Sequence, residues 1–142
     1  MTRFALLLLL AAGCGHRYRV NEAAENVPNV FLHEVRVRGG STKLVLRFEA
    51  DEACEIGVPP PGDPAAFVLR SGERTFRLTG VSGVEELPAK TRVDARGSRR
   101  FTLEFEPLPD DVGEFDVSGE IAGTGPLVFA VRLDAPNVVS CP

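Results

Sequence analysis

The chain has 142 residues, of which 44% are hydrophobic and 25% are charged, and its formal net charge is −4. This composition excludes a disordered chain, a collagen-like repeat and a membrane protein with several spans, and it is typical of one globular domain with short extensions. The acidic balance also argues against a nucleic-acid partner, because domains that bind nucleic acids usually carry a basic face.

The first 14 residues form the clearest motif of the sequence. Arg3 precedes an apolar run over residues 4–12, and small residues then lead directly into Cys14. Nine residues in a helix would span about 14 Å, half of a hydrocarbon core of about 30 Å, so the run predicts an export signal rather than a membrane-spanning helix.

This segment resembles the signal of bacterial lipoproteins, in which such a cysteine is acylated and becomes the mature N-terminus. The resemblance implies that residues 1–13 are a signal peptide and that acyl chains such as palmitate on Cys14 hold the protein at a membrane of the cell envelope. Gly15, in place of the aspartate that often retains such proteins at the inner membrane, favours the outer membrane. The alternative is an ordinary secretory signal with a cysteine near its cleavage site.

Residues 14–29, which include the predicted lipidated cysteine, are predicted to form a tether. Residues 15–28 show no alternation typical of a strand, and at no more than about 3.6 Å per residue they could reach about 50 Å from the bilayer. Arg17 and Arg19 could contact anionic headgroups, where two cations contribute at most about 2 kcal/mol. We expect both side chains to be solvated.

From residue 30 onward, apolar and polar residues alternate with a period of two, which predicts strands with one buried face. Turn residues such as the Gly39-Gly40 pair separate the segments, and Gly119 suggests a bulge. Seven or eight short strands predict an immunoglobulin-like antiparallel β-sandwich over residues 30–136, with a small β-barrel as the alternative. The predicted strands cover residues 34–38, 44–49, 65–70, 75–79, 91–95, 101–105, 115–121 and 127–133.

Residues 101–109 read FTLEFEPLP, and Phe115, Asp116 and Glu120 follow. This pattern, FxLxFxPLP…FDxxE, resembles a short immunoglobulin-like module of secreted and envelope proteins of bacteria, over about residues 30–134. The resemblance implies the sandwich fold, and it implies no catalytic activity or ligand. The motif also has a structural interpretation, because the two prolines cannot donate to a ladder and would end the strand.

Two cysteines remain after Cys14. In an exported protein we expect Cys54 and Cys141 to form a disulfide, which would close a loop of about 88 residues and contribute up to about 4–5 kcal/mol. The bridge would tie the C-terminal tail, residues 137–142, to the loop after residue 49. The alternatives are a buried free thiol at Cys54 and a Cys141 available for pairing with another chain. No cationic neighbour in sequence activates either thiol.

The sequence offers little for catalysis. His16 and His33 are the only histidines, and no metalloprotease, serine-hydrolase or phosphate-loop motif is present. The one acidic cluster that could hold Ca²⁺ lies at a turn, although such turns are most often just solvated. Its carboxylates are Asp110, Asp111, Glu114 and Asp116; a second, weaker cluster comprises Asp51, Glu52 and Glu55.

Two basic clusters complete the inventory of polar motifs. One lies at a predicted turn and one on a predicted hairpin, and cross-strand pairing with glutamates at 104 and 106 is the simplest role for both. Binding of an anionic glycan or a partner protein is the alternative. The clusters consist of Arg96, Arg99 and Arg100, and of Arg70, Arg74 and Arg77.

Together these observations predict a lipid-anchored envelope protein without enzymatic activity, cofactor or metal, which acts as an interaction module. We expect loops 50–64 and 107–116 to contact an envelope protein or a glycan, because loops on a rigid sandwich commonly carry binding. The alternatives are a metal- or carboxylate-dependent hydrolase and a calcium-binding domain that uses the acidic 110–116 loop.

Overall fold

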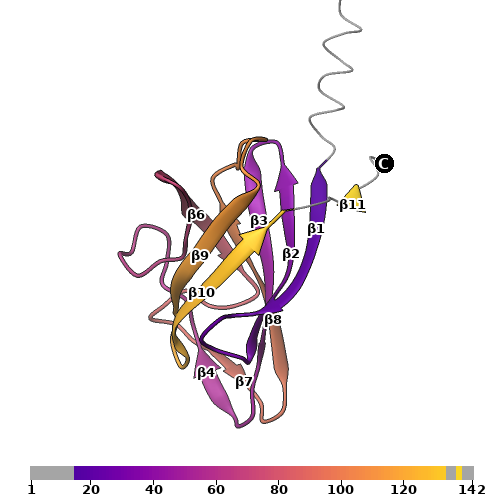
Figure 1. Ribbon diagram of the computed structural model, residues 1–142. Coiled ribbons are helices and arrows are strands. Elements are labelled where there is room, and N and C mark those ends of the chain that lie inside the picture. Colours follow the sequence, from indigo (N-terminus) through magenta and orange to yellow (C-terminus); the bar gives the residue numbers. More distant parts are fainter. Residues whose placement is uncertain (1–14, 134–136, 139–142) are drawn as a thin grey trace, which may run out of the picture.

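The computed structural model describes residues 15–133 and 137–138. This part of the chain consists of strands and loops without a helix (Figure 1), and none of it forms a helix that could cross a membrane. The prediction of an all-β protein is therefore confirmed. The strands are β1 (His16–Ala23), β2 (Val30–Arg38), β3 (Ser41–Glu49), β4 (Cys54–Ile56), β5 (Val68–Ser71), β6 (Arg74–Ser82), β7 (Thr91–Val93), β8 (Ser98–Phe105), β9 (Glu114–Ile121), β10 (Gly125–Arg132) and β11 (Asn137–Val138).

Nine of these strands form one antiparallel sheet in the order β10-β9-β5-β6-β8-β3-β2-β1-β11, and β4 pairs separately with β7. The sheet folds over at β6, because the first half of that strand pairs with β5 and the second half pairs with β8. A register shift between Leu78 and Gly80 lies at the start of the second half. Two layers therefore share one strand, and β9 and β10 lie across β2 and β3 (Figure 1).

The outer edges of the folded sheet return to each other. The Glu25 amide donates to the Val128 carbonyl at 2.9 Å. The Asn26 side chain donates to the Pro126 carbonyl at 2.6 Å and accepts from the Val128 amide at 3.2 Å. These bonds take the place of a neighbouring strand at the edge of β10. An unpaired edge strand could otherwise pair with a strand of another molecule. The architecture of the folded sheet is therefore intermediate between the predicted sandwich and the alternative barrel.

The core fills the space between the layers with the inward residues of the predicted strands. Phe101, Leu103 and Phe105, from the FTLEFEPLP segment, are all fully buried. Thr42 is the one buried polar residue of the described chain, and its Oγ1 accepts from the Leu108 amide at 2.9 Å. The Pro-Leu-Pro segment after β8 is thereby fastened to β3 at the point where the strand ends.

Gly119 does not mark a bulge, because β9 and β10 pair in unbroken register through it. Its role is close approach: a Cβ placed there would lie 2.5 Å from the ring of Phe67 and 2.8 Å from its Cα. The Phe67 side chain is fully buried over this position. Only glycine leaves room for this aromatic ring.

The prediction that residues 14–29 form a tether is wrong for most of that segment. Residues 16–23 form β1, which pairs with β2, so that the folded domain begins about 14 residues earlier than the predicted boundary at residue 30. Asn137 and Val138 of the predicted tail form β11 and pair with Arg17 and His16. The predicted signal peptide over residues 1–13, Cys14 and residues 139–142 lie outside the described residues.

Candidate functional site

Charge is segregated on the surface of the larger layer. Strands β2, β3 and β8 bury residues of one side against the core and turn side chains of the other side outward, and β1 extends this surface with Tyr18 and Val20 partly buried. Among the described residues, this outward surface carries seven basic and three acidic side chains, although the whole chain has a net charge of −4. We call it the basic face; its charged members are Arg17, Arg19, Arg36, Arg38, Lys43, Arg47 and Arg100, with Glu34, Glu49 and Glu104.

The strand register places basic side chains of this face directly opposite one another. Arg17 pairs with Arg36 across β1 and β2, and Arg36 pairs with Lys43 across β2 and β3. Arg47 of β3 lies opposite Arg100 of β8. Like charges in such positions destabilise a sheet, so the face holds positive charge that folding alone does not favour.

At the end of the basic face nearest residue 15, the surface is hollowed into a small groove of about 140 Å³. Its cationic walls come from Arg17, Arg36, Arg38 and Lys43. Glu34 accepts from Arg36 at 2.9 Å and lies 3.0 Å from Arg17 Nε. Burial alone would raise the pKa of Glu34, but the hydrogen bond from Arg36 and the charges of both arginines outweigh it and lower this pKa. One ionised carboxylate thus holds two guanidinium groups in place.

Further along the face, His33 lies among arginines. Arg47 stacks over the Phe31 ring at 5.3 Å from its centroid and pairs with Glu49 at 2.8 Å. Burial and the positive charges of Arg47 and Arg100 lower the pKa of His33. Within the described residues, the buried Nε2 of His33 and Nε of Arg47 have no hydrogen-bond partner. Unpaired polar atoms of this kind carry a desolvation cost.

The predicted acidic cluster does not converge on a common centre. Asp111 pairs with Arg74 at 2.6 Å, and this hydrogen bond lowers the pKa of the exposed carboxyl. Glu114 pairs instead with Arg132 at 2.7 Å. Asp110 remains at the turn. In the described part of the chain, no group of three histidine, cysteine, aspartate or glutamate residues could hold a metal ion.

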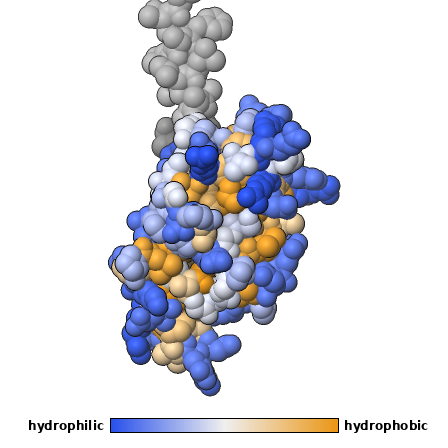
Figure 2. All heavy atoms as spheres, turned by 90° about the vertical axis from the view of Figure 1, so that its left-hand side faces the viewer, coloured by the Kyte–Doolittle hydropathy of each residue, from blue (hydrophilic) through white to orange (hydrophobic). Residues whose placement is uncertain are grey.

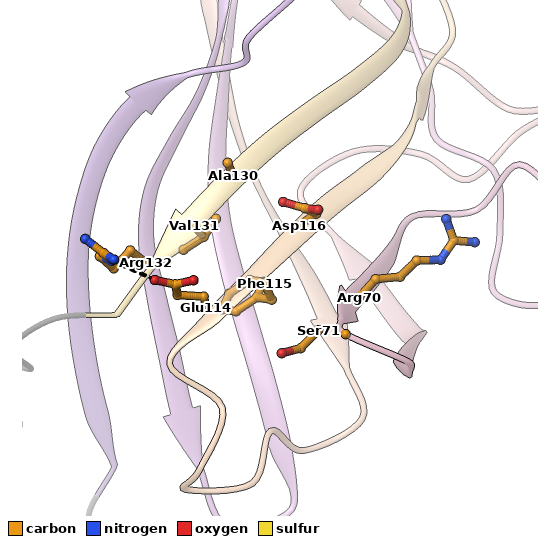
Figure 3. A pocket seen from close by; sticks show the side chains of 9 residues that line it. Arg70, Ser71, Glu114, Phe115, Asp116, Ala130, Val131 and Arg132 are labelled. Carbon is orange, nitrogen blue, oxygen red and sulfur yellow. Dashed lines mark hydrogen bonds and ion pairs between the residues drawn. The ribbon is translucent and has the colours of Figure 1, made fainter.

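Two of these carboxylates border a shallow hollow of about 420 Å³ on the outer side of β5, β9 and β10 (Figure 3). Glu114 turns toward Arg132, whereas Asp116 stands on β9 and the Arg70 guanidinium extends away from it (Figure 3). The hollow is open to solvent and its charged side chains diverge. It therefore lacks the convergent polar groups that a small-molecule site needs.

The predicted binding loops are largely fixed to the core. In loop 50–64, Ile56 and Val58 are fully buried, and Gly57 bridges to Ala122. In loop 107–116, Leu108 and Val112 are buried. Both loops thus close the ends of the sheet, and their exposed residues form short stretches.

Cys54 lies half-buried in β4, and its thiol has no disulfide partner among the described residues. It borders a second open hollow, together with Asp51 and Glu52 of the weaker acidic cluster. Its predicted partner Cys141 and the predicted lipidation site Cys14 both lie outside the described residues, so the disulfide and the acylation stay predictions.

The predicted basic clusters have separate roles. Arg99 donates through Nε to the Gly83 carbonyl at 2.6 Å. The Arg77 amide, rather than its guanidinium, bonds to Glu106 at 2.8 Å. Arg100 belongs to the basic face, which the sequence reasoning missed because its members come from four strands. A helical wheel or motif search would not reveal it; the strand register does.

Apolar residues reach the surface in separate places on the side of the molecule shown in Figure 2. Figure 2, which faces the left-hand side of Figure 1, shows separate hydrophobic patches bordered by hydrophilic side chains. Scattered patches of this kind are usual on soluble domains and do not mark a docking surface. No protein-family profile, curated protein sequence or solved structure matches this chain.

Proposed function

We propose that this chain is a lipoprotein of the bacterial outer membrane that works by binding an acidic partner protein rather than by catalysis. The signal-like residues 1–13 and Cys14 support the anchor, and the immunoglobulin-like resemblance supports a presenting scaffold. The basic face supports the binding role. The acidic loops favour neither a hydrolase nor a calcium site, because Asp111 and Glu114 bind arginines.

The observation that carries this proposal is the like-charge pairing on the basic face. Arg47 and Arg100 face each other across β3 and β8, and both contribute to the lowered pKa of His33. Repulsion of this kind weakens the folded state in isolation. A carboxylate from a partner, placed between two guanidinium groups, would turn the repulsion into charge-assisted hydrogen bonds.

An acidic protein surface is the partner that fits this arrangement. Phe31 is partly exposed beside Arg47 and adds an apolar contact of the kind that protein interfaces use at their centre. Complementary charge would raise the rate of association and make it sensitive to salt. An anionic glycan is the competing ligand, and the test below separates the two.

A photo-cross-linking residue at Thr102 tests this surface in living cells, because Thr102 lies on β8 in the middle of the basic face, opposite Val45. The matched control is Thr75, on the outer side of β6. We expect a discrete, protease-sensitive product from position 102 that disappears when Arg47 and Arg100 are both changed to glutamate.

Two results would overturn the binding role. One is a set of products at position 75, but not at 102. The other is a product at 102 that persists in the double variant. A product that resists protease and yields to glycan-degrading enzymes would replace the protein partner by a glycan. The anchor is tested separately: mass spectrometry of the N-terminal peptide should show acylated Cys14, and an unmodified thiol there would refute the lipoprotein assignment.

A further inference from the structure

The start of β1 is pressed against the hairpin that joins β2 and β3. Gly15 is buried, and a Cβ on it would lie 2.8 Å from the Val37 carbonyl oxygen and 3.4 Å from the Arg38 Cβ. The next residue, His16, already pairs with Val37. The chain is therefore fixed to the domain from residue 15 onward, at the end of β1 that lies beside the β2–β3 hairpin (Figure 1), and Gly15 and His16 line the cationic groove.

This junction removes the long reach that a tether would have given. Only Gly15 separates Cys14 from β1, and two residues extend the chain by no more than about 7 Å. If Cys14 carries acyl chains, the first strand begins at the level of the lipid headgroups. The walls of the groove would then face the bilayer surface.

From this geometry we propose that the cationic groove beside Gly15 binds the phosphate groups of anionic phospholipids in the membrane that holds the acyl chains. The inference rests on the proposed acylation of Cys14. It assigns the groove to the membrane and leaves the rest of the basic face to a partner protein. The domain would consequently sit in one orientation on the bilayer.

The chemistry of the groove suits phosphate. Arg17, Arg36 and Lys43 form one row across three strands, and Arg38 adds a fourth cation at the hairpin. Glu34 is the single carboxylate that the structure pairs with this group of cations. The groove, with a volume of about 140 Å³, leaves room for a phosphate group between these cations.

Arg38 and Lys43 are both exposed, and no carboxylate in the described residues lies within ion-pair distance of either. They are therefore the groups available to a headgroup, while Arg17 and Arg36 are held by Glu34. Each cation near an anionic surface contributes about 1 kcal/mol, which corresponds to about a fivefold change in binding.

The test uses the full acylated protein reconstituted into two kinds of vesicle, phosphatidylcholine alone and phosphatidylcholine mixed with phosphatidylglycerol. Hydrogen exchange is measured at the hairpin amides of Gly39, Gly40 and Ser41. We expect exchange there to slow by about fivefold or more in the anionic vesicles, and to return to the rate in phosphatidylcholine at high salt.

A double variant with Arg38→Glu and Lys43→Glu should abolish this lipid-dependent slowing. The matched control carries Lys90→Glu and Arg96→Glu, which make the same change in net charge at the opposite end of the domain, next to β7. It should behave like the unchanged protein. Exchange of the core amides in each variant shows whether it is folded.

The outcomes separate the groove from the anchor. If the protein floats with both kinds of vesicle but hairpin exchange is equal in the two, the headgroup site is overturned. The lipoprotein assignment is not affected by that result. Slowing that survives Arg38→Glu with Lys43→Glu would also overturn the headgroup site. Failure to float with either vesicle would overturn the anchor, and with it the site. Slowing in anionic vesicles that only the groove variant removes supports the proposal.

Discussion

Replacing Thr42 with valine tests what ends strand β8 after its FTLEF segment. Valine has nearly the shape of threonine but cannot accept the hydrogen bond that the buried Leu108 amide donates at 2.9 Å. An unsatisfied buried amide costs about 1–3 kcal/mol, and the methyl group that replaces the hydroxyl returns up to about 0.8 kcal/mol. We therefore expect the free energy of unfolding to fall by about 1–2 kcal/mol.

Urea unfolding followed by far-ultraviolet circular dichroism measures this loss, since the chain has no tryptophan and one tyrosine. For a domain of this size the midpoint should fall by about 0.5–1 M, and the melting temperature by about 3–6 °C. Thr42→Ser is the control, because serine keeps the hydroxyl and loses one methyl group. Hydrogen exchange at the Leu108 amide should accelerate in the valine variant and remain slow in the serine variant.

The valine and serine variants show whether the Thr42 hydroxyl, rather than the prolines alone, holds the segment after β8. If the Leu108 amide stays equally protected in both, the hydroxyl does not hold the segment. A valine variant as stable as the original protein would lead to the same conclusion. In either case the prolines alone would account for the end of β8.

Three further predictions concern packing, pH and the sheet edge. Gly119→Ala should lower the free energy of unfolding by about 2 kcal/mol, because its Cβ would overlap the Phe67 ring, whereas Gly113→Ala has open space and should change little in the same urea titration. The folded state lowers the pKa of His33 below its usual 6.5, so the free energy of unfolding should be highest above pH 6.5 and fall as the pH drops below that value. His33→Gln should flatten this part of a plot of melting temperature against pH. Asn26→Ala removes two hydrogen bonds at the β10 edge and should cost about 1 kcal/mol and promote self-association, so an unchanged light-scattering mass with unchanged stability would contradict the edge-cap role.

The strands of the core were predictable because their signal is local. Alternation around Leu44 and Phe48 and around Phe101 and Phe105 places one row of side chains inward, and the same residues are buried in the structure. Segment 65–70 was predicted too long, since β5 begins at Val68 after a turn. Local alternation therefore predicts the all-β class of fold, but it does not predict how the two edges of the sheet come together.

β1 escaped prediction because its alternation is short. Tyr18 and Val20 are its only partly buried apolar residues, and a register shift between Arg19 and Glu22 interrupts the period. β4 escaped because it has three residues within an acidic segment. Each of these strands is held mainly by its neighbour, which is information that a single-sequence pattern does not contain.

The basic face escaped prediction for a related reason. Net charge averages over the molecule, so a value of −4 conceals a surface where cations outnumber carboxylates. The net charge of the whole chain, which disfavours a nucleic-acid partner, therefore does not describe the charge of this face. Which cations stand together depends on the register of Arg36 with Lys43 and of Arg47 with Arg100, and register is fixed only when the sheet forms.

The pairing of early with late residues of the described chain affects how the polypeptide folds during synthesis. Glu25 and Asn26 bond to residues about 100 positions later, and β1 is completed by β11. Pairings of such long sequence separation form slowly, and here they cannot form until the chain has been synthesised as far as Val138. During synthesis the edges of β1 and β10 therefore stay unpaired until these late residues reach them.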